Sequence, residues 1–295
     1  MIDKFIEYIK VEKRYSPLTA QAYENDLYAL CSFLNVEPCE FDPKNTTEDD
    51  IKAFLIHELD QGKSARSVNR YLSSFRSFWK YLLRVGYTDI DITARIISPK
   101  IEHQLPVFYK EEEMERATAL ESTDDDFVSV RDSLIIELLY QTGMRRAELL
   151  ALKCNDVDYM LKQLKVLGKR DKERYIPVSD KLLQQVERYI EYRNALPRQE
   201  NNGELLLSDK GKPLSKTTLY NIVHTRMSEV STLKKQSPHV LRHTFATTML
   251  DHGADINTIK TIMGHANLAA TQIYTHTTFE QIRKEYKKAH PRAKK

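Results

Sequence analysis

Glycine, proline and cysteine are all scarce in this sequence, and each shortage excludes a class of protein. The 295 residues include 8 glycines and 10 prolines, too few for a collagen-like or low-complexity chain. The three cysteines, Cys31, Cys39 and Cys154, form no Cys-x-x-Cys pair, which argues against a disulfide framework and against a zinc knuckle. We therefore expect a globular chain with free thiols.

Long apolar runs are missing as well. No stretch approaches the ~18 apolar residues of a membrane-spanning helix, so no membrane partner is expected. The start of the chain, Met1 to Glu7, lacks the layout of a signal peptide, and the expected location is cytoplasmic. The length allows about two domains, and the 41% hydrophobic and 29% charged content is ordinary for a soluble protein.

Charge is almost balanced overall, but one segment carries cations alone. The formal net charge is +3, with 13 Lys and Arg against 15 Asp and Glu in residues 1–98, and 32 against 27 in residues 99–295. Residues 61–84 hold six cations and no acid. A stripe of one sign is what DNA phosphates attract, whereas a solvated helix face is the alternative. The predicted DNA contacts are Lys63, Arg66, Arg70, Arg76 and Lys80.

The spacing of apolar residues predicts a helical domain over residues 1–98. In its last helix, apolar residues recur every three or four positions, at Val68, Leu72, Phe75, Trp79 and Leu82. That period is typical of an amphipathic α-helix with one buried face. Weaker patterns predict three earlier helices, over residues 2–12, from Ser16-Pro17 onward, and from Thr47 to about Leu59. Thr47 stands three residues before Asp50, the spacing of a capping box.

Two prolines mark the end of this domain. Pro99 and Pro106 bracket a polar stretch, and proline discourages helix in the residue before it, so residues 99–106 are a predicted linker. Residues 107–295 are expected to form a second domain, mainly helical with a small strand region. Within it, two short alternating runs flank a charged turn, which predicts a β-hairpin over residues 164–177 with Lys169 at its tip.

The second domain contains side chains that suit reaction at a phosphate. A DNA phosphodiester gains negative charge when its phosphorus becomes five-coordinate. Fixed guanidinium groups offset this charge, because the planar fork of Arg pairs with two phosphate oxygens. Arg145 and Arg242 are the candidates, since both lie in apolar helical contexts where an unpaired Arg is costly. A structural salt bridge, for example between Arg145 and Glu148, is the alternative.

Histidine and tyrosine complete the candidate set. His239 lies three residues before Arg242 at a predicted helix start, and its ordinary pKa of ~6.5 suits acid–base chemistry. Of the 16 tyrosines, Tyr274 stands out because it follows His265 by nine residues in a local motif. A phenol has an ordinary pKa of ~10, so it needs cationic neighbours to act as a nucleophile at neutral pH.

Two other chemistries lack their motifs. His239 and His243 are four residues apart, as in the helix of a zinc protease, but Val240 stands where such a helix needs Glu. No Gly-x-x-x-x-Gly-Lys-Ser/Thr loop is present, so ATP-driven chemistry has no support. Neither zinc nor ATP is therefore expected.

Taken together, the motifs resemble those of the tyrosine recombinases, the phage integrase family. The matching segments are Thr142–Leu149, Gly168–Arg174, His239–His243, Gly264-His265 and Tyr274–His276, with Tyr15–Leu27 in the first domain. The resemblance implies a mainly α fold with a small β-sheet region. In this fold a helical SAM-like core-DNA-binding domain and an α+β catalytic domain form a two-domain, C-shaped clamp around duplex DNA. One departure is Arg170, where the family often has Gly.

The resemblance also implies a role for each catalytic candidate. Tyr274 attacks the scissile phosphate and forms a 3′-phosphotyrosyl link. Arg145 and Arg242 bind that phosphate, and Lys169 protonates the leaving 5′-oxygen.

Three further residues support this chemistry in the family. His239 serves as acid and base, His265 supports the phosphate and the tyrosine, and Glu148 helps hold the arginine and histidine arrangement. The covalent link conserves bond energy, so rejoining needs neither ATP nor a metal, and no cofactor is expected.

Partners and biological role follow from the same resemblance. Family members assemble as tetramers on two DNA sites, and residues 279–289 are expected to form a helix that docks onto a neighbouring protomer. The chain length and the ending from Lys287 to Ala293 resemble the Xer recombinases. That likeness implies resolution of chromosome dimers at a dif-like site with a paralogous recombinase and an FtsK-type DNA translocase. An integrase of a transposon or other mobile element, and a DNA-binding protein that does not cut, are the alternatives.

Overall fold

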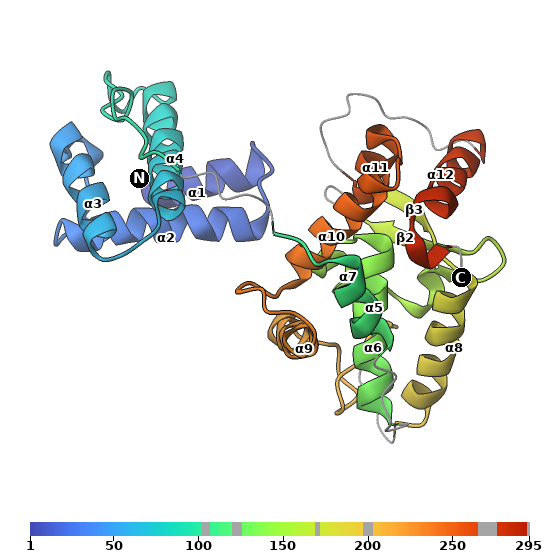
Figure 1. The fold of residues 1–295 in the computed structure, drawn as a ribbon. Helices are drawn as coiled ribbons and strands as arrows, with labels where there is room; N and C mark the ends of the chain where they lie inside the picture. Colours follow the sequence, from blue (N-terminus) through green and yellow to red (C-terminus); the bar gives the residue numbers. More distant parts are fainter. Residues whose placement is uncertain (102–106, 120–125, 169–171, 197–202, 265–275, 294–295) are drawn as a thin grey trace. The chain divides into compact units, whose positions relative to one another are not determined.

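The computed structural model describes residues 1–101, 107–119, 126–168, 172–196, 203–264 and 276–293. The chain forms two units, Met1–Gln104 and Leu105–Lys295 (Figure 1). The N-terminal unit is helical, and the C-terminal unit adds a three-stranded antiparallel sheet to its helices. These features confirm the mainly α fold with a small sheet. No helix in the described ranges is long and apolar enough to cross a membrane.

Local capping explains where the N-terminal helices begin. The described part of this unit consists of α1 (Ile2–Val11), α2 (Pro17–Phe33), the 3-10 turn η1 (Pro43–Asn45), α3 (Glu48–Asp60) and α4 (Ala65–Arg84). The hydroxyls of Ser16 and Ser64 accept hydrogen bonds from the backbone N–H of the third residue of α2 and of α4, both at 3.2 Å. Thr47 and Asp50 form the predicted capping box at the start of α3.

One face of α4 lies at the centre of the N-terminal core. Its five apolar residues with helical spacing are at most 1% exposed, as the spacing predicts. They pack against α2 and α3. Burial of each such side chain stabilises the fold by ~1.5–3 kcal/mol, so this face holds the unit together. The opposite face of α4 presents its cations to solvent.

The C-terminal unit contains the predicted hairpin. Its described elements are α5 (Glu111–Ala119), α6 (Phe127–Thr142), α7 (Arg146–Ala151), η2 (Cys154–Asp156), β1 (Val157–Asp158), β2 (Gln163–Leu167), β3 (Glu173–Pro177), α8 (Asp180–Asn194), α9 (Lys216–Ser228), α10 (Pro238–Asp251), α11 (Ile256–Met263), α12 (His276–Ala289) and η4 (Pro291–Ala293). The strands pair in the order β1-β2-β3. Strands β2 and β3 form the hairpin, with Val166 opposite Arg174.

Helix α6 runs through the middle of this unit (Figure 1). Every residue from Leu134 to Thr142 is buried, and the helix packs against α5, α8, α9 and α10. A helix surrounded on all sides is mainly apolar, which explains the strongly apolar sequence of this segment. Its buried polar side chains have partners, as where Nε2 of Gln141 donates to Oε2 of Glu137 at 2.9 Å. The buried end of α6 therefore provides a rigid base for the residues that follow it.

Helix α12 lies against its own domain. Ile282, Tyr286 and Ala289 are at most 4% exposed, and α12 packs against α10, α11 and β3. His290 follows the helix, with its ring centroid 5.3 Å from that of Tyr286 and 5.6 Å from that of Phe245. Complete burial lowers the pKa of His290 to about 3. The helix predicted to dock onto a neighbouring protomer thus packs its apolar side chains against its own domain.

Candidate active site

The C-terminal end of α6 positions the first candidate arginine. The helix ends at Gly143, whose φ of 56° lies in the left-handed region that glycine favours. Two residues later, Arg145 is the N-cap of α7. The backbone N–H of Arg145 donates to Oε2 of Glu148 at 2.7 Å, and its Nη1 donates to Oε1 at 2.8 Å. The salt bridge considered as an alternative is therefore present, and it leaves the Arg145 side chain 37% exposed.

Glycine is required at position 143. A Cβ at this position would lie 2.3 Å from Cδ1 of Phe245, a buried residue of α10. We expect Gly143→Ala to destabilise the C-terminal unit by about 3 kcal/mol or more, because overpacking adds to left-handed strain. Thermal unfolding measures this loss. Gly253→Ala is the matched control, since Gly253 has a φ of 77° but no atom of the described residues within 4 Å of its Cβ position. Equal losses would contradict the clash.

Arg242 reaches the same place from α10. It is 7% exposed, its Nη1 donates to the carbonyl oxygen of Gly143, and its Nη2 donates to that of Met263 at 2.7 Å. Burial, followed by the charge of Arg145, lowers the pKa of Arg242 to about 10, so the guanidinium stays charged at neutral pH. Two cationic groups are therefore held in one place, an arrangement that a bound anion stabilises.

A buried carboxylate and a third arginine tie this pair to the sheet. Glu148 is 6% exposed, and Arg174, from β3, is 4% exposed. Nη1 and Nη2 of Arg174 donate to Oε1 and Oε2 of Glu148 at 3.0 and 2.8 Å. Burial by itself raises the pKa of Glu148, but the hydrogen bonds and charge of Arg174, with the hydrogen bonds of Arg145, outweigh it and hold the pKa below its ordinary value. The carboxylate is thus ionised and shared by two arginines.

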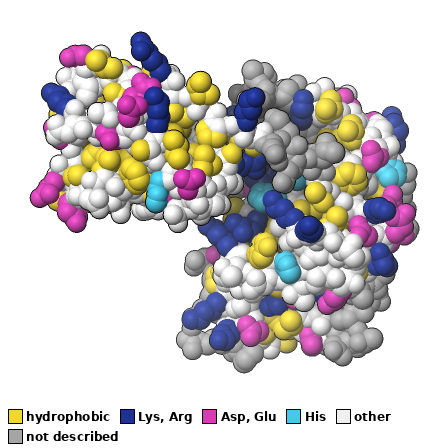
Figure 2. Space-filling model, turned by 60° about the vertical axis from the view of Figure 1, so that its left-hand side comes forward, with side chains coloured by type: hydrophobic (Ala, Val, Ile, Leu, Met, Phe, Trp, Pro, Cys, Tyr) yellow, Lys and Arg dark blue, Asp and Glu magenta, His cyan; other side chains and the backbone are white. Residues whose placement is uncertain are grey.

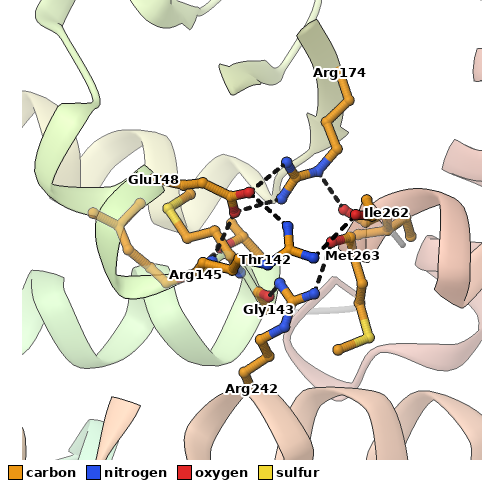
Figure 3. Close-up of polar contacts among 11 residues, drawn as sticks. Thr142, Gly143, Arg145, Glu148, Arg174, Arg242, Ile262 and Met263 are labelled. Carbon is orange, nitrogen blue, oxygen red and sulfur yellow. Dashed lines mark hydrogen bonds and ion pairs between the residues drawn. The ribbon is translucent and has the colours of Figure 1, made fainter. Parts of the chain in front are cut away.

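Three guanidinium groups converge on the C-terminal end of α11 (Figure 3). The last carbonyl groups of a helix lack partners within the helix and carry partial negative charge, so nearby cations stabilise them. Each guanidinium binds a different carbonyl oxygen, and the pairs are Arg174 Nε with Ile262, Arg242 Nη2 with Met263, and Arg145 Nη2 with Gly264, at 2.7, 2.7 and 3.0 Å. The contacts fix the end of α11 immediately before His265 in the sequence.

His239 lies in the first turn of α10, one turn before Arg242. The residue as a whole is exposed, but nearby residues of the same chain remove part of the water around its ring. This loss of water, followed by the charges of Arg146 and His243, lowers the pKa of His239 below 6.5, so the ring is mainly neutral at pH 7. Figure 2 shows histidine side chains among Lys and Arg side chains on one face of the C-terminal unit.

Some of the predicted site residues lie outside the described ranges, namely Lys169, His265 and Tyr274, together with Arg170 of the hairpin turn. The residues that precede two of them meet at Arg174. A Cβ at Gly168 would lie 3.5 Å from Nη1 of Arg174, and a Cβ at Gly264 would lie 3.1 Å from the same atom. The structure therefore brings Arg145, Arg242 and the chain next to Lys169 and His265 to one place.

Arg174 is a site residue that sequence reasoning missed. In the sequence it is only the last residue of the Gly168–Arg174 motif. A signal was nevertheless present, because alternate residues of a strand share one face, and Arg174 shares the buried face of β3 with Ile176. A cation at an inward strand position indicates a buried partner of opposite charge.

The predicted DNA-binding stripe, formed by cations of α4 and by Lys63 just before it, is partly engaged within the N-terminal unit. The internal partners are Glu58 and Tyr71 for Lys63, Asp26 for Arg70, and the carbonyl oxygen of Ile96 for Arg76. The side chains of Lys63 and Arg70 remain 44% and 48% exposed, so this pairing does not remove them from the surface. Arg66 and Lys80 are exposed. The stripe therefore has a structural role in addition to any contact with DNA.

A cleft beside α4 extends this basic surface. Its volume is about 540 Å³, and none of its lining residues is acidic. Cations and aromatic rings along one groove form a surface suited to nucleic acids. The lining residues are Tyr8, Lys13, Tyr15, Tyr23, Ser73, Arg76, Ser77, Lys80, Tyr81 and Arg84. Lys13 and the tyrosines were not predicted as DNA contacts. Tyr8, Lys13, Tyr15 and Tyr23 come from α1, α2 and the segment between these helices, and Tyr81 lies on α4 itself.

Comparison with known proteins gives the family. The profile of the phage integrase family matches residues 108–281, and that of the phage integrase N-terminal SAM-like domain matches residues 2–86. Tyrosine recombinase XerC of Staphylococcus saprophyticus is 38% identical over 295 residues, covering 99% of this chain and 97% of that protein. Tyrosine recombinase XerD of Listeria innocua is 35% identical, with 99% of both chains covered.

Solved structures of recombinases share the fold. The crystal structure of XerA recombinase matches with a TM-score of 0.50 and 29% sequence identity. The match covers 99% of this chain and 98% of the XerA chain. The Tn1549 transposon integrase in complex with transposon right end DNA has a TM-score of 0.71 and covers 96% and 97%, although its 20% identity supports only the fold. This chain belongs to the phage integrase family and is a tyrosine site-specific recombinase, an enzyme that cleaves and rejoins DNA.

Proposed function

We propose that this recombinase is a Xer-type enzyme that resolves chromosome dimers at a dif-like site and so serves chromosome partition at cell division. The observation that carries the proposal is the match in length and sequence to relatives named XerC and XerD, which are 35–38% identical over 99% of this chain and at least 97% of their own length. Because relatives of both names match about equally, a paralogous recombinase is the proposed partner.

Arg145 and Arg242 are the proposed ligands of the scissile phosphate. They are held together through the chain around Gly143 and Gly264, and each guanidinium has five N–H donors in a planar fork. The exposed side of Arg145 gives the phosphate access, whereas the buried Arg242 supplies a fixed charge. Both charges are in place before reaction, so they stabilise the negative charge that develops on the phosphate.

Tyr274 is the proposed nucleophile. Its oxygen bonds to phosphorus as the bond from phosphorus to the 5′-oxygen breaks, which conserves the phosphoester and allows rejoining by the reverse step. Lys169 gives a proton to the leaving 5′-oxygen, and the mainly neutral His239 accepts or returns a proton. His265 and Glu148 support the arrangement, and the steps consume neither ATP nor a metal.

Duplex DNA is the proposed substrate, bound by a clamp of the two units, with four protomers on two sites and an FtsK-type translocase as a further partner. The stripe on α4 and the adjoining cleft are the proposed surface for phosphates in the N-terminal unit. Docking of α12 onto a neighbouring protomer through its apolar face would require Ile282 and Tyr286 to leave the contacts that bury them within this chain.

DNA affinity is expected to fall steeply with salt, because Lys and Arg displace counterions from the phosphates. Lys80→Ala and Arg66→Ala should each reduce the slope of log affinity against log salt by about 1. Gel-shift titrations over a salt series measure this slope. Lys52→Ala is the control, because Lys52 is a partly exposed lysine of the same unit already paired with Glu48 at 2.9 Å on α3. A salt-independent affinity would contradict the proposed surface.

A map of covalent adducts in host cells tests the proposed role. Cells are denatured rapidly, DNA attached to this protein is recovered, and the attachment points are sequenced, with Tyr274→Phe as the control. A single tyrosine-dependent site per chromosome supports the Xer role. Adducts at the ends of mobile elements would instead assign the protein as an integrase. DNA that is bound without any covalent link would indicate a DNA-binding protein that does not cut.

A further inference from the structure

We propose that Arg174 is a positioning residue for strand cleavage. It holds Arg145 and the end of α11 in their reactive arrangement and does not itself contact DNA. The inference rests on the proposed function of Arg145 as a ligand of the scissile phosphate, and it adds to that function a residue of β3 that no motif role covers.

The first support is that Arg174 is fully engaged inside the protein. Each guanidinium nitrogen has a partner: Nε donates to the carbonyl oxygen of Ile262 at 2.7 Å, and Nη1 and Nη2 donate to Glu148 at 3.0 and 2.8 Å (Figure 3). The residue is 4% exposed, whereas the Arg145 side chain is 37% exposed. A phosphate can therefore reach Arg145 but not Arg174, which acts only through its neighbours.

The second support is the distribution of charge. Oε1 of Glu148 accepts from Nη1 of Arg145 at 2.8 Å and from Nη1 of Arg174 at 3.0 Å. Because two cations share one buried carboxylate, a positive charge remains for an incoming phosphate. Without Arg174, Glu148 would pair with Arg145 alone and would offset most of its charge.

The third support is the position of Arg174 between two chain segments of the site. Gly168 precedes Lys169, and Gly264 precedes His265. A Cβ at either glycine would lie within 3.5 Å of Nη1 of Arg174, so the guanidinium packs against both glycines. A side chain of different shape at position 174 would therefore displace the chain next to both residues, as well as Arg145.

The test compares covalent product formed by the wild type, Arg174→Lys and Arg131→Lys on two DNA substrates built on the site that the adduct map identifies. One has the natural scissile phosphodiester, and the other has an uncharged methylphosphonate there. Arg174→Lys keeps the charge but loses the fork, so we expect about 100-fold slower cleavage of the phosphodiester. On the methylphosphonate substrate, the rate of Arg174→Lys should fall by only about 10-fold or less relative to the wild type. The uncharged group develops less negative charge for Arg145 to offset.

Arg131→Lys is the matched control. Arg131 is another buried arginine of the same unit, 5% exposed and paired with Asp132 at 2.7 Å, but it lies in the first turns of α6, whereas the site adjoins the last turn. Arg131→Lys should cleave both substrates at the wild-type rates. The ratio of the two rates within one variant does not depend on how much of the protein is folded. Wild-type cleavage by Arg174→Lys, or an equal loss on both substrates, would overturn the proposal.

Amide hydrogen exchange of the DNA-free protein supplies a readout that does not involve cleavage. Arg174→Lys should exchange faster than the wild type in the last turn of α11 and in α7, and Arg131→Lys should not. If the wild type forms no covalent product while this exchange result holds, the proposed function fails and the positioning by Arg174 stands. If the wild type cleaves DNA and exchange in Arg174→Lys is unchanged, the positioning role is wrong.

Discussion

Replacing Tyr274 by Phe is expected to abolish the covalent protein–DNA product and to leave DNA binding intact. The substitution removes the oxygen that would bond to phosphorus and keeps the ring, so chemistry is lost and the aromatic packing surface is retained. A nicked suicide substrate measures the product on a denaturing gel, because the cut end diffuses away and the intermediate is trapped. A gel shift on the same DNA measures binding.

Tyr220→Phe is the matched control for this prediction. Tyr220 lies on α9 of the same unit and is 40% exposed, so its hydroxyl is accessible but has no assigned role in cleavage. We expect it to form the covalent product at the wild-type rate. A covalent product from Tyr274→Phe would refute the assignment, and mass spectrometry of the linked peptide would then show which of the 16 tyrosines reacts.

Arg242→Ala is expected to slow cleavage by about 10²- to 10³-fold, the typical cost of removing one fixed donor to a developing oxyanion. The variant also loses the contacts that join the end of α6 at Gly143 to the end of α11 at Met263. Arg242→Lys should be nearly as slow, because an ammonium group cannot reproduce the planar fork that spans these two carbonyls. Single-turnover cleavage of the suicide substrate measures both rates.

Arg226→Ala controls for the loss of an arginine as such. Arg226 lies on α9 and donates to Ser133 of α6 at 3.2 Å, outside the site. Its cleavage rate should stay near that of the wild type. Cleavage by Arg242→Ala at the wild-type rate, in a variant whose melting temperature shows that it is folded, would remove Arg242 from the catalytic set.

Local sequence patterns predicted several elements of the fold. The apolar period of α4, the capping box of Thr47 and Asp50, and the β2–β3 hairpin all appear in the structure. The helical period and the capping box depend on residues a few positions apart, and the hairpin depends on two strands joined by a short turn. The spacing of residues in the sequence therefore indicates each of them directly. The candidate residues Arg145 and Arg242 could be named for a similar reason, since their motifs are continuous in the chain.

Packing and pairing across the fold were not predictable in this way. Arg174 was missed because its partner Ile262 is 88 residues away, and the periodicity of one strand does not show what lies against its buried face. The stripe cation Arg70 proved to be paired with Asp26, 44 residues earlier. The contacts of Ile282 and Tyr286 within their own domain were not predictable either, because the amphipathic pattern of α12 does not show which surface covers its apolar face.

The sequence by itself determined the residue types, their order and the local helices and strands, and with them the family and its chemistry. The tertiary structure decided which charges are shared, which are buried and which remain available to a phosphate. The physical reason is that an arginine has the same sequence signature in every setting. Its effective charge depends on desolvation and on partners such as Glu148, which only the fold brings within hydrogen-bonding distance.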